Sequence, residues 1–162
     1  MPISKIDVFE NLDNAIDFVT ANFPDRHVNV SVRSFTPELY VFANELLLDV
    51  FENILINSIM YNRNDPVKID VNISQDQIND NDYVRFEFKD NGIGVEDERK
   101  DLIFQNIKGL GKNNSKGMGL GLSLVAKFIG LCEGKISVED RIKGDSSKGS
   151  NFIIHLRQYI DN

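Results

Sequence analysis

The stretch from Asn44 to about Tyr61 constrains the fold more than any other part of the sequence. Its apolar residues recur at helical spacing and share one broad face with Ser58: Leu47, Val50, Phe51, Ile54, Leu55 and Ile59. A helix with such a face must bury it against another layer of structure. The pattern therefore predicts a long amphipathic helix packed on a sheet.

Other stretches show either helical periodicity or the alternation of apolar and polar residues that is typical of strands. We expect helices over 6–22 and 119–131 and a short helix over 96–104. Strands are predicted at 28–32, near residue 40, and at 67–74, 83–89, 135–139 and 151–157, with polar turns at 75–82 and 143–149. The predicted fold class is α/β (α+β): a two-layer sandwich of one mixed, mostly antiparallel sheet with about three main helices on one face.

Length, charge and composition limit the possible functions. The 162 residues suit one domain, 1–162, and the net charge of −7 argues against nucleic acid as a partner. No apolar run approaches the roughly 18 residues of a membrane span, so we expect no direct membrane contact from this stretch. The single cysteine, Cys132, lies in an apolar helical pattern and is interpreted as a buried thiol, and together these features favour the cytoplasm.

Two asparagines interrupt the apolar face of the 44–61 helix. Asn53 and Asn57 are four residues apart and stack on one side, with Tyr61 four further on. A buried asparagine without a partner costs about 1–3 kcal/mol, so these side chains need partners. They could be helix caps or surface residues, or an amide oxygen could complete the shell of Mg²⁺, which is usually shared with substrate phosphates. Tyr61 could then pack on a base or ribose.

Two glycine-rich segments follow. Asp90-Asn91-Gly92-Ile93-Gly94 ends a predicted strand, where its carboxylate could accept a hydrogen bond from an exocyclic amine such as that of adenine; a tight turn would also explain the glycines. Gly117-Met118-Gly119-Leu120-Gly121-Leu122 precedes a predicted helix and lacks the phosphate-loop and dinucleotide fingerprints. Bare amides at a helix start can bind phosphate, although a packing turn would use the same glycines. A basic segment lies just before this run, over 105–118.

Together, in this order, these segments resemble a known family. Asn53 to Ser58, Asp90-x-Gly92-x-Gly94 and Gly117-x-Gly119-x-Gly121-Leu122 resemble the asparagine box and the two glycine boxes of sensor histidine kinase catalytic domains. Ile103-Phe104 is similar to the phenylalanine box, and Gly149-Ser150-Asn151-Phe152 to the motif of the last strand. The wider superfamily includes gyrase, the Hsp90 chaperones and the MutL proteins, and the likeness implies a Bergerat-type ATP-binding fold across nearly the whole chain.

The resemblance also implies roles for single residues. Asn57 would coordinate Mg²⁺, with Asn53 close to the phosphates, and Asp90 would bind the adenine amine of ATP. A mobile lid would span about 105–118, and its lysines could neutralise phosphate charge or be merely solvated: Lys108, Lys112 and Lys116. The remaining nucleotide contacts would come from Tyr61, Gly92, Ile93, Gly94, Phe104, Gly117, Met118, Gly119, Leu120, Gly121 and Leu122, with Ser150 or Asn151 touching adenine through water.

One position favours phosphoryl transfer over hydrolysis. Hydrolysing members of the superfamily have a glutamate four residues before the metal-binding asparagine, and Asn53 stands there instead. Glu52 lies about 100° round the helix. Neither His27 nor His155 has the surroundings of a phosphoacceptor, so the expected partners are a separate helical phosphoacceptor domain and the receiver domain of a response regulator.

Two departures from the family pattern keep other functions open. Met60 stands where the family often has a lysine or arginine, and Ile107 lies near the place of the second phenylalanine-box aromatic. A non-catalytic nucleotide-sensing module and a serine kinase of the anti-sigma-factor type are therefore the alternatives.

Overall fold

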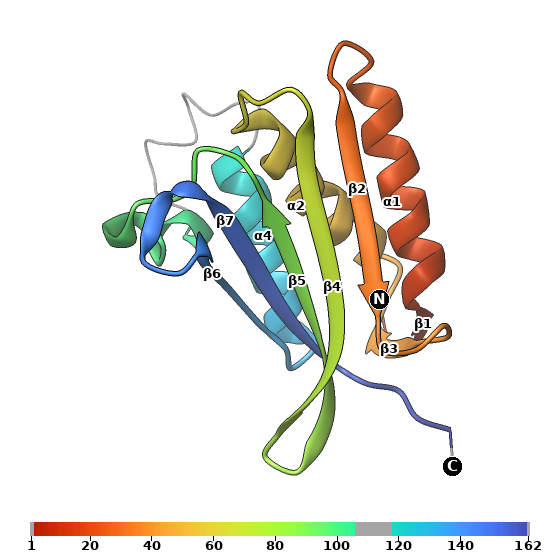
Figure 1. Ribbon diagram of the computed structural model, residues 1–162. Coiled ribbons are helices and arrows are strands. Elements are labelled where there is room, and N and C mark those ends of the chain that lie inside the picture. The colour runs from red at the N-terminus through yellow and green to blue at the C-terminus, as the bar shows by residue number, and fades with distance from the viewer. Residues whose placement is uncertain (1, 106–117, 162) are drawn as a thin grey trace.

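The computed structural model describes residues 2–105 and 118–161, leaving out the side chains of residues 118–120. The described residues form two layers (Figure 1), a twisted five-stranded sheet and helices packed on one of its faces. The helices are α1 (Val8–Asn22), α2 (Leu47–Met60) and α4 (Met118–Leu131), with 3-10 helices η1 (Asp97–Arg99) and η2 (Leu102–Phe104). The strands are β1 (Ser4–Asp7), β2 (Val28–Ser34), β3 (Tyr40–Ala43), β4 (Val67–Ile78), β5 (Asn81–Asp90), β6 (Lys135–Ile142) and β7 (Asp145–Arg157).

The sheet is mixed and mostly antiparallel, as predicted. Its order is β2-β4-β5-β7-β6, in which β2 runs parallel to β4 and every other neighbouring pair is antiparallel. β1 and β3 form a separate two-stranded sheet. The predicted fold class is therefore confirmed. No helix among the described residues has the length and hydropathy that a bilayer span requires.

The first helix starts later than its periodicity predicts. Helical spacing extends to Ile6, but Ile6 pairs with Val41 in the β1–β3 sheet, so α1 begins at Val8. Asp7 caps the helix, and its side chain accepts a hydrogen bond of 3.1 Å from the Glu10 N–H. The capping carboxylate therefore fixes the boundary that periodicity leaves open.

Both predicted polar turns are too long. Residues 75–78 and 81–82 continue the strands, and the β4–β5 turn is only Asn79 and Asp80, whose φ angles are 50° and 66°. Such left-handed values at both central residues suit the right-handed twist of a two-residue hairpin. Likewise, β7 starts at Asp145 rather than 151. Polar residues fill these arms because the hairpin ends extend into solvent, and this polarity made them resemble loops. The predicted 96–104 helix is also divided, into η1 and η2.

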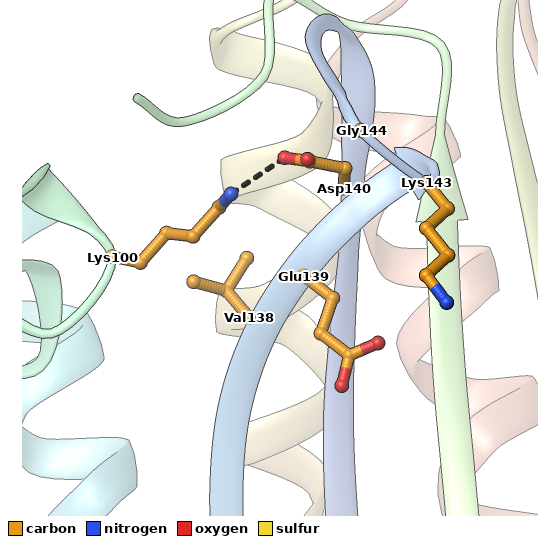
Figure 2. A pocket seen from close by; sticks show the side chains of 6 residues that line it. All are labelled: Lys100, Val138, Glu139, Asp140, Lys143 and Gly144. Carbon is orange, nitrogen blue, oxygen red and sulfur yellow. Dashed lines mark ion pairs between the residues drawn. The ribbon is translucent and has the colours of Figure 1, made fainter. Parts of the chain in front are cut away.

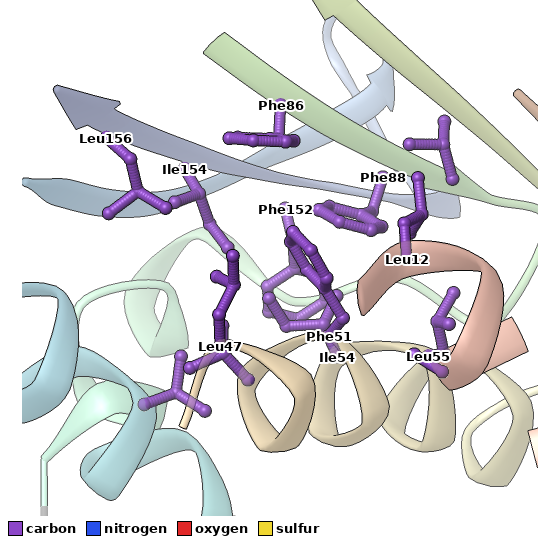
Figure 3. Packing of buried hydrophobic residues seen from close by; sticks show 14 of the residues in the cluster. Leu12, Leu47, Phe51, Ile54, Leu55, Phe86, Phe88, Phe152, Ile154 and Leu156 are labelled. Atoms are coloured by element: carbon purple, nitrogen blue, oxygen red, sulfur yellow. The ribbon is translucent and has the colours of Figure 1, made fainter. Parts of the chain in front are cut away.

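Aromatic rings join α2 to the centre of the sheet (Figure 3). The ring of Phe51 on α2 lies 5.5 Å from that of Phe86 and 5.9 Å from that of Phe88, both on β5. All three side chains are fully buried, and such tilted contacts are a favourable arrangement of aromatic pairs. This packing fixes α2 against the strand that ends in Asp90.

Candidate functional site

Asp90 is the last residue of β5 and lies almost completely out of solvent, with 3% of its surface exposed. Its Oδ1 accepts hydrogen bonds from the Gly92 N–H at 2.9 Å and the Ser150 N–H at 3.2 Å. Burial raises the pKa of Asp90, while these two donors and a hydrogen bond with the Ser58 hydroxyl act in the opposite direction. The site therefore holds one carboxylate in a fixed orientation beside α2.

The glycines after Asp90 are required by close packing. A methyl group at Gly92 would lie 2.6 Å from the Tyr61 carbonyl oxygen, and one at Gly94 would lie 1.7 Å from that of Ser146. Gly94 also has φ of +77°, where side chains are strained. The tight-turn explanation thus holds for both glycines, and it does not exclude a ligand, because the same turn aims the Asp90 carboxylate.

Asn57 is a buried amide without a partner in the described part of the chain. It is 7% exposed on α2, one residue from Ser58, and its side chain makes no hydrogen bond with residues 2–105 or 121–161. Buried polar side chains are normally paired, so an unpaired one suits a ligand-binding role. The described residues contain no group of three or more His, Cys, Asp or Glu side chains that could hold a metal ion. An amide oxygen alone fits Mg²⁺ held mainly by substrate phosphates and water.

Asn53 lies beside α4. Its Nδ2 donates to the Asp49 carbonyl oxygen at 2.8 Å, and its Oδ1 would be 2.8 Å from a methyl group at Gly121. The structure thereby brings the asparagine helix next to the third glycine of the Gly117–Gly121 run. Leu122 follows with its side chain in the core, 5% exposed, so the predicted contact with nucleotide is not supported for this side chain.

Part of the predicted site falls outside the described residues. This applies to Lys108, Lys112, Lys116 and Gly117, and so to nearly all of the predicted 105–118 lid. Met118, Gly119 and Leu120 belong to the first turn of α4, but their side chains are also outside the description. Their assigned roles stay predictions.

Tyr61 and Ile93 form an exposed edge next to Asp90. The Ile93 N–H donates to the Tyr61 carbonyl oxygen at 3.1 Å, and the two residues are 46% and 50% exposed. Phe104 instead faces inward, with its ring 6.2 Å from that of Phe152 in an edge-on contact. Phe104 therefore packs against the sheet, whereas the exposed side chains of Tyr61 and Ile93 are accessible to a ligand.

Ser150 and Asn151 lie on opposite faces of the sheet. Ser150 shares the helix-covered face with Asp90, since Phe88 pairs with Phe152 in the same register. Asn151, one residue on, projects to the other face and donates to Glu87 Oε2 at 2.8 Å. Of the two residues predicted as alternatives for a contact with adenine, this alternation puts Ser150 beside Asp90 and Asn151 on the other face.

Sequence reasoning missed the residues that support the Asp90 turn. Asn91 Oδ1 accepts hydrogen bonds from Asn62 Nδ2 at 2.7 Å and the Lys68 N–H at 3.0 Å, and its Nδ2 donates to the Pro66 carbonyl oxygen at 3.3 Å. Arg26 donates to the Asn62 carbonyl oxygen at 2.7 Å. Asn62 and Asn64 were a signal in the sequence, but such polar residues are equally typical of a turn.

Comparison with known proteins identifies the class to which this fold and site belong. Residues 42–160 match the family model described as histidine kinase-, DNA gyrase B- and HSP90-like ATPase. The chain belongs to this ATPase family.

Its relatives are sensor histidine kinases. Sensor histidine kinase Hik2 of Synechocystis sp. is 27% identical over 165 residues, which cover 97% of this chain and 38% of Hik2. The chain thus spans less than two fifths of that relative. The catalytic domain of histidine kinase ThkA, in a nucleotide-free form, shares the fold with a TM-score of 0.79 at 22% identity, covering 98% of this chain and 97% of that catalytic-domain chain. A complex of ThkA with response regulator TrrA matches with a TM-score of 0.72 at 20% identity, covering 97% of this chain and 42% of that one.

Proposed function

We propose that this chain is the Mg-ATP-binding catalytic domain of a histidine kinase in a two-component system. It supplies the γ-phosphoryl group of ATP to a histidine on a separate helical dimerisation domain. The observation that carries the proposal is the combination of an oriented, buried carboxylate at Asp90 with the nearby amide of Asn57, which makes no hydrogen bond with the described residues and lies one residue from the Ser58 that contacts Asp90. We also propose a cytoplasmic location, where ATP is available.

The adenine end of the nucleotide belongs at Asp90. A carboxylate whose Oδ1 is held by two backbone N–H groups accepts an exocyclic amine in a defined direction. The exposed edge of Tyr61 and Ile93 offers apolar surface to the base. Ser150 adjoins the carboxylate through its N–H and lies within reach of a bridging water.

The phosphate end belongs between Asn57 and the start of α4. Mg²⁺ bound there would neutralise phosphate charge and orient the triphosphate. Asn57 would supply an amide oxygen to the ion, and Asn53 with the first turn of α4 would face the phosphates. We assign Lys108, Lys112 and Lys116 to phosphate neutralisation because they lie in the segment that leads to this turn.

Transfer to another domain, rather than hydrolysis, is favoured by what surrounds Asn53. Its amide cannot take a proton from water, and its Nδ2 donates to the Asp49 carbonyl oxygen.

The two histidines of the chain lie away from the site. His155 projects from the sheet face opposite Asp90, where its Nε2 lies 3.1 Å from Asp76 Oδ2, and His27 lies near Asp65. Neither histidine adjoins the site, and we therefore propose that the acceptor lies on another domain. By analogy with the ThkA–TrrA pair, a response regulator receives the phosphoryl group next.

The decisive binding test is Asn57→Ala, measured calorimetrically with Mg-ATP and with ATP in EDTA. Losing a ligand to a charged group should weaken Mg-ATP binding about tenfold or more. Binding without magnesium should change much less. Asn81→Ala, at the start of β5 and the far end of the β4–β5 hairpin, is the matched control. Equal affinities for wild type and Asn57→Ala in both conditions would contradict the proposed site.

The transferase activity needs its own test. Labelled ATP, this domain and the cognate dimerisation domain should yield acid-labile phosphate on the acceptor. Met60, exposed and uncharged, favours a second candidate, a nucleotide sensor without transferase activity. Nucleotide binding without any label on the acceptor would select that candidate, and acid-stable phosphate would indicate a serine kinase.

A further inference from the structure

A partly buried ion pair ties the segment after the Asp90 turn to the edge of the sheet (Figure 2). Lys100 Nζ lies 2.6 Å from Asp140 Oδ1 on β6 and also contacts the Asp97 carboxylate. The Lys100 and Asp140 side chains are only 19% and 13% exposed. Within the described part of the chain, Asp140 Oδ1 has no partner other than Lys100. The lysine is thus the cation that compensates a partly buried carboxylate.

This ion pair stands beside the candidate nucleotide site. Asp140 pairs with Ser150 across β6 and β7, and the Ser150 N–H donates to Asp90 Oδ1. Paired residues of antiparallel strands project to the same face, so Asp140, Ser150 and Asp90 form one row across three strands. Lys100 contacts Asp140 at the β6 end of this row. It also lines a surface pocket of about 390 Å³.

Lys100 also lies between two other points at which the 92–104 segment contacts the rest of the domain. The first is Gly94, packed against the Ser146 carbonyl. The last is Phe104, whose ring contacts Phe152 while η2 lies against α4. Lys100 sits between η1 and η2, so its position affects how η2 meets the helix that carries Gly121.

We propose that Lys100 is a positioning residue for nucleotide binding. It acts through Asp140 to hold η1 and η2, and with them the Asp90 turn and α4, in the binding arrangement. This inference rests on the proposed function, because it assigns Lys100 to the same Mg-ATP site. None of the motifs in the sequence includes either member of the pair.

Stability and affinity must be separated in the test. Lys100→Met leaves Asp140 buried without its cation and should lower the melting temperature. The double variant Lys100→Met with Asp140→Asn removes the Asp140 carboxylate charge together with the ion pair. Its melting temperature should therefore recover toward that of wild type. A positioning role predicts that Mg-ATP affinity stays about fivefold below wild type in the double variant, a change typical of one lost pairwise contact. A purely structural role predicts that affinity recovers together with stability.

Two further variants sharpen the comparison. Lys143→Met removes a lysine from the same pocket that is exposed and forms no ion pair with the described residues, and it should bind like wild type. Lys100→Arg keeps the cation and should retain affinity within about twofold. Both are measured by calorimetry with Mg-ATP, next to thermal unfolding without nucleotide.

The outcomes separate the two proposals. A double variant that is stable and binds Mg-ATP like wild type overturns the positioning role, as does a Lys143→Met variant that loses as much affinity. If wild type itself fails to bind Mg-ATP, the proposed function falls, and the role of Lys100 falls with it. A folded double variant with weakened binding, rescued in Lys100→Arg, supports the inference.

Discussion

The Gly149 backbone packs directly on the carbonyl group of Asp90. A methyl group at position 149 would lie 2.0 Å from the Asp90 carbonyl oxygen, and Gly149 has φ of +105°. The residue that follows, Ser150, donates its N–H to the Asp90 side chain. The start of the β7 ladder against β5 and the orientation of the candidate adenine ligand therefore depend on the same contact.

Gly149→Ala should be one of the most destabilising single substitutions in this chain. It combines a clash with backbone atoms and an unfavourable φ, so the free energy of unfolding should fall by about 3 kcal/mol or more. Chemical denaturation measures this change. Gly144→Ala is the matched control, because Gly144 has φ of +86° but nothing lies within 4 Å of its added methyl. The control should lose only about 1–2 kcal/mol; similar losses in both variants would contradict the packing argument.

Asp90→Asn should make the domain more stable at neutral pH while impairing ATP binding. The folded-state pKa of Asp90 is raised by burial. A group with a raised pKa contributes stability that is present below its unfolded pKa, ordinarily 3.8, and is lost as pH rises through its folded pKa. Ionised Asp90 therefore costs stability at neutral pH, and a neutral amide avoids that cost while its oxygen still accepts both N–H groups.

Unfolding curves of wild type and Asp90→Asn from pH 4 upward check this sign. The stability difference in favour of the variant should grow with pH and level off above the folded pKa. A variant that becomes relatively less stable as pH rises would show that the carboxylate is favoured by the fold.

Asn91→Ala should destabilise the Asp90 turn. It leaves the Asn62 Nδ2 and the Lys68 N–H without their acceptor, so we expect a loss of about 1–3 kcal/mol in the free energy of unfolding. Asn91→Asp keeps both acceptor contacts and should lose less. Asn72→Ala, on β4, removes an asparagine that makes no side-chain hydrogen bond within the described residues. If Asn72→Ala proves as costly, the network around Asn91 is not the cause.

Met60→Lys should strengthen ATP binding. Met60 is exposed at the end of α2, three residues after Asn57, and a cation there would add attraction to the triphosphate. An exposed charge contributes modestly, so we expect about a threefold lower Kd by calorimetry. Leu131→Lys adds the same charge at the opposite end of α4 from Gly121 and should leave the Kd unchanged. Unchanged binding in Met60→Lys would place residue 60 away from the phosphates.

Local patterns predicted the elements better than their limits. The helical spacing of 47–59 gave α2, and alternation gave the central parts of β4 and β5, because these periods are properties of a short stretch. β1 was not predicted, because its four residues are defined by pairing with β3, which follows α1 and β2 in the chain. The hairpin arms at 75–78 and 145–148 were predicted as parts of loops because solvent-exposed strand ends carry polar residues on both faces.

The candidate site divides in the same way. The order of the asparagine, Asp90 and glycine segments was readable from the sequence, and the family match confirms the resemblance built on it. The side-chain directions were not readable. Ser150 and Asn151 differ by one residue, yet only the strand register decides that Ser150 meets Asp90 and Asn151 meets Glu87.

The sequence alone determined the class of fold, the family and the three segments that meet at the site, because residue spacing within a helix, strand or turn is encoded locally. The tertiary structure decided which groups meet across strands: the N–H of residue 150 on Asp90, the packing of Gly149 and the Lys100–Asp140 pair. The physical reason is that such contacts depend on the register and crossing of elements far apart in the chain, and no single stretch of sequence specifies these.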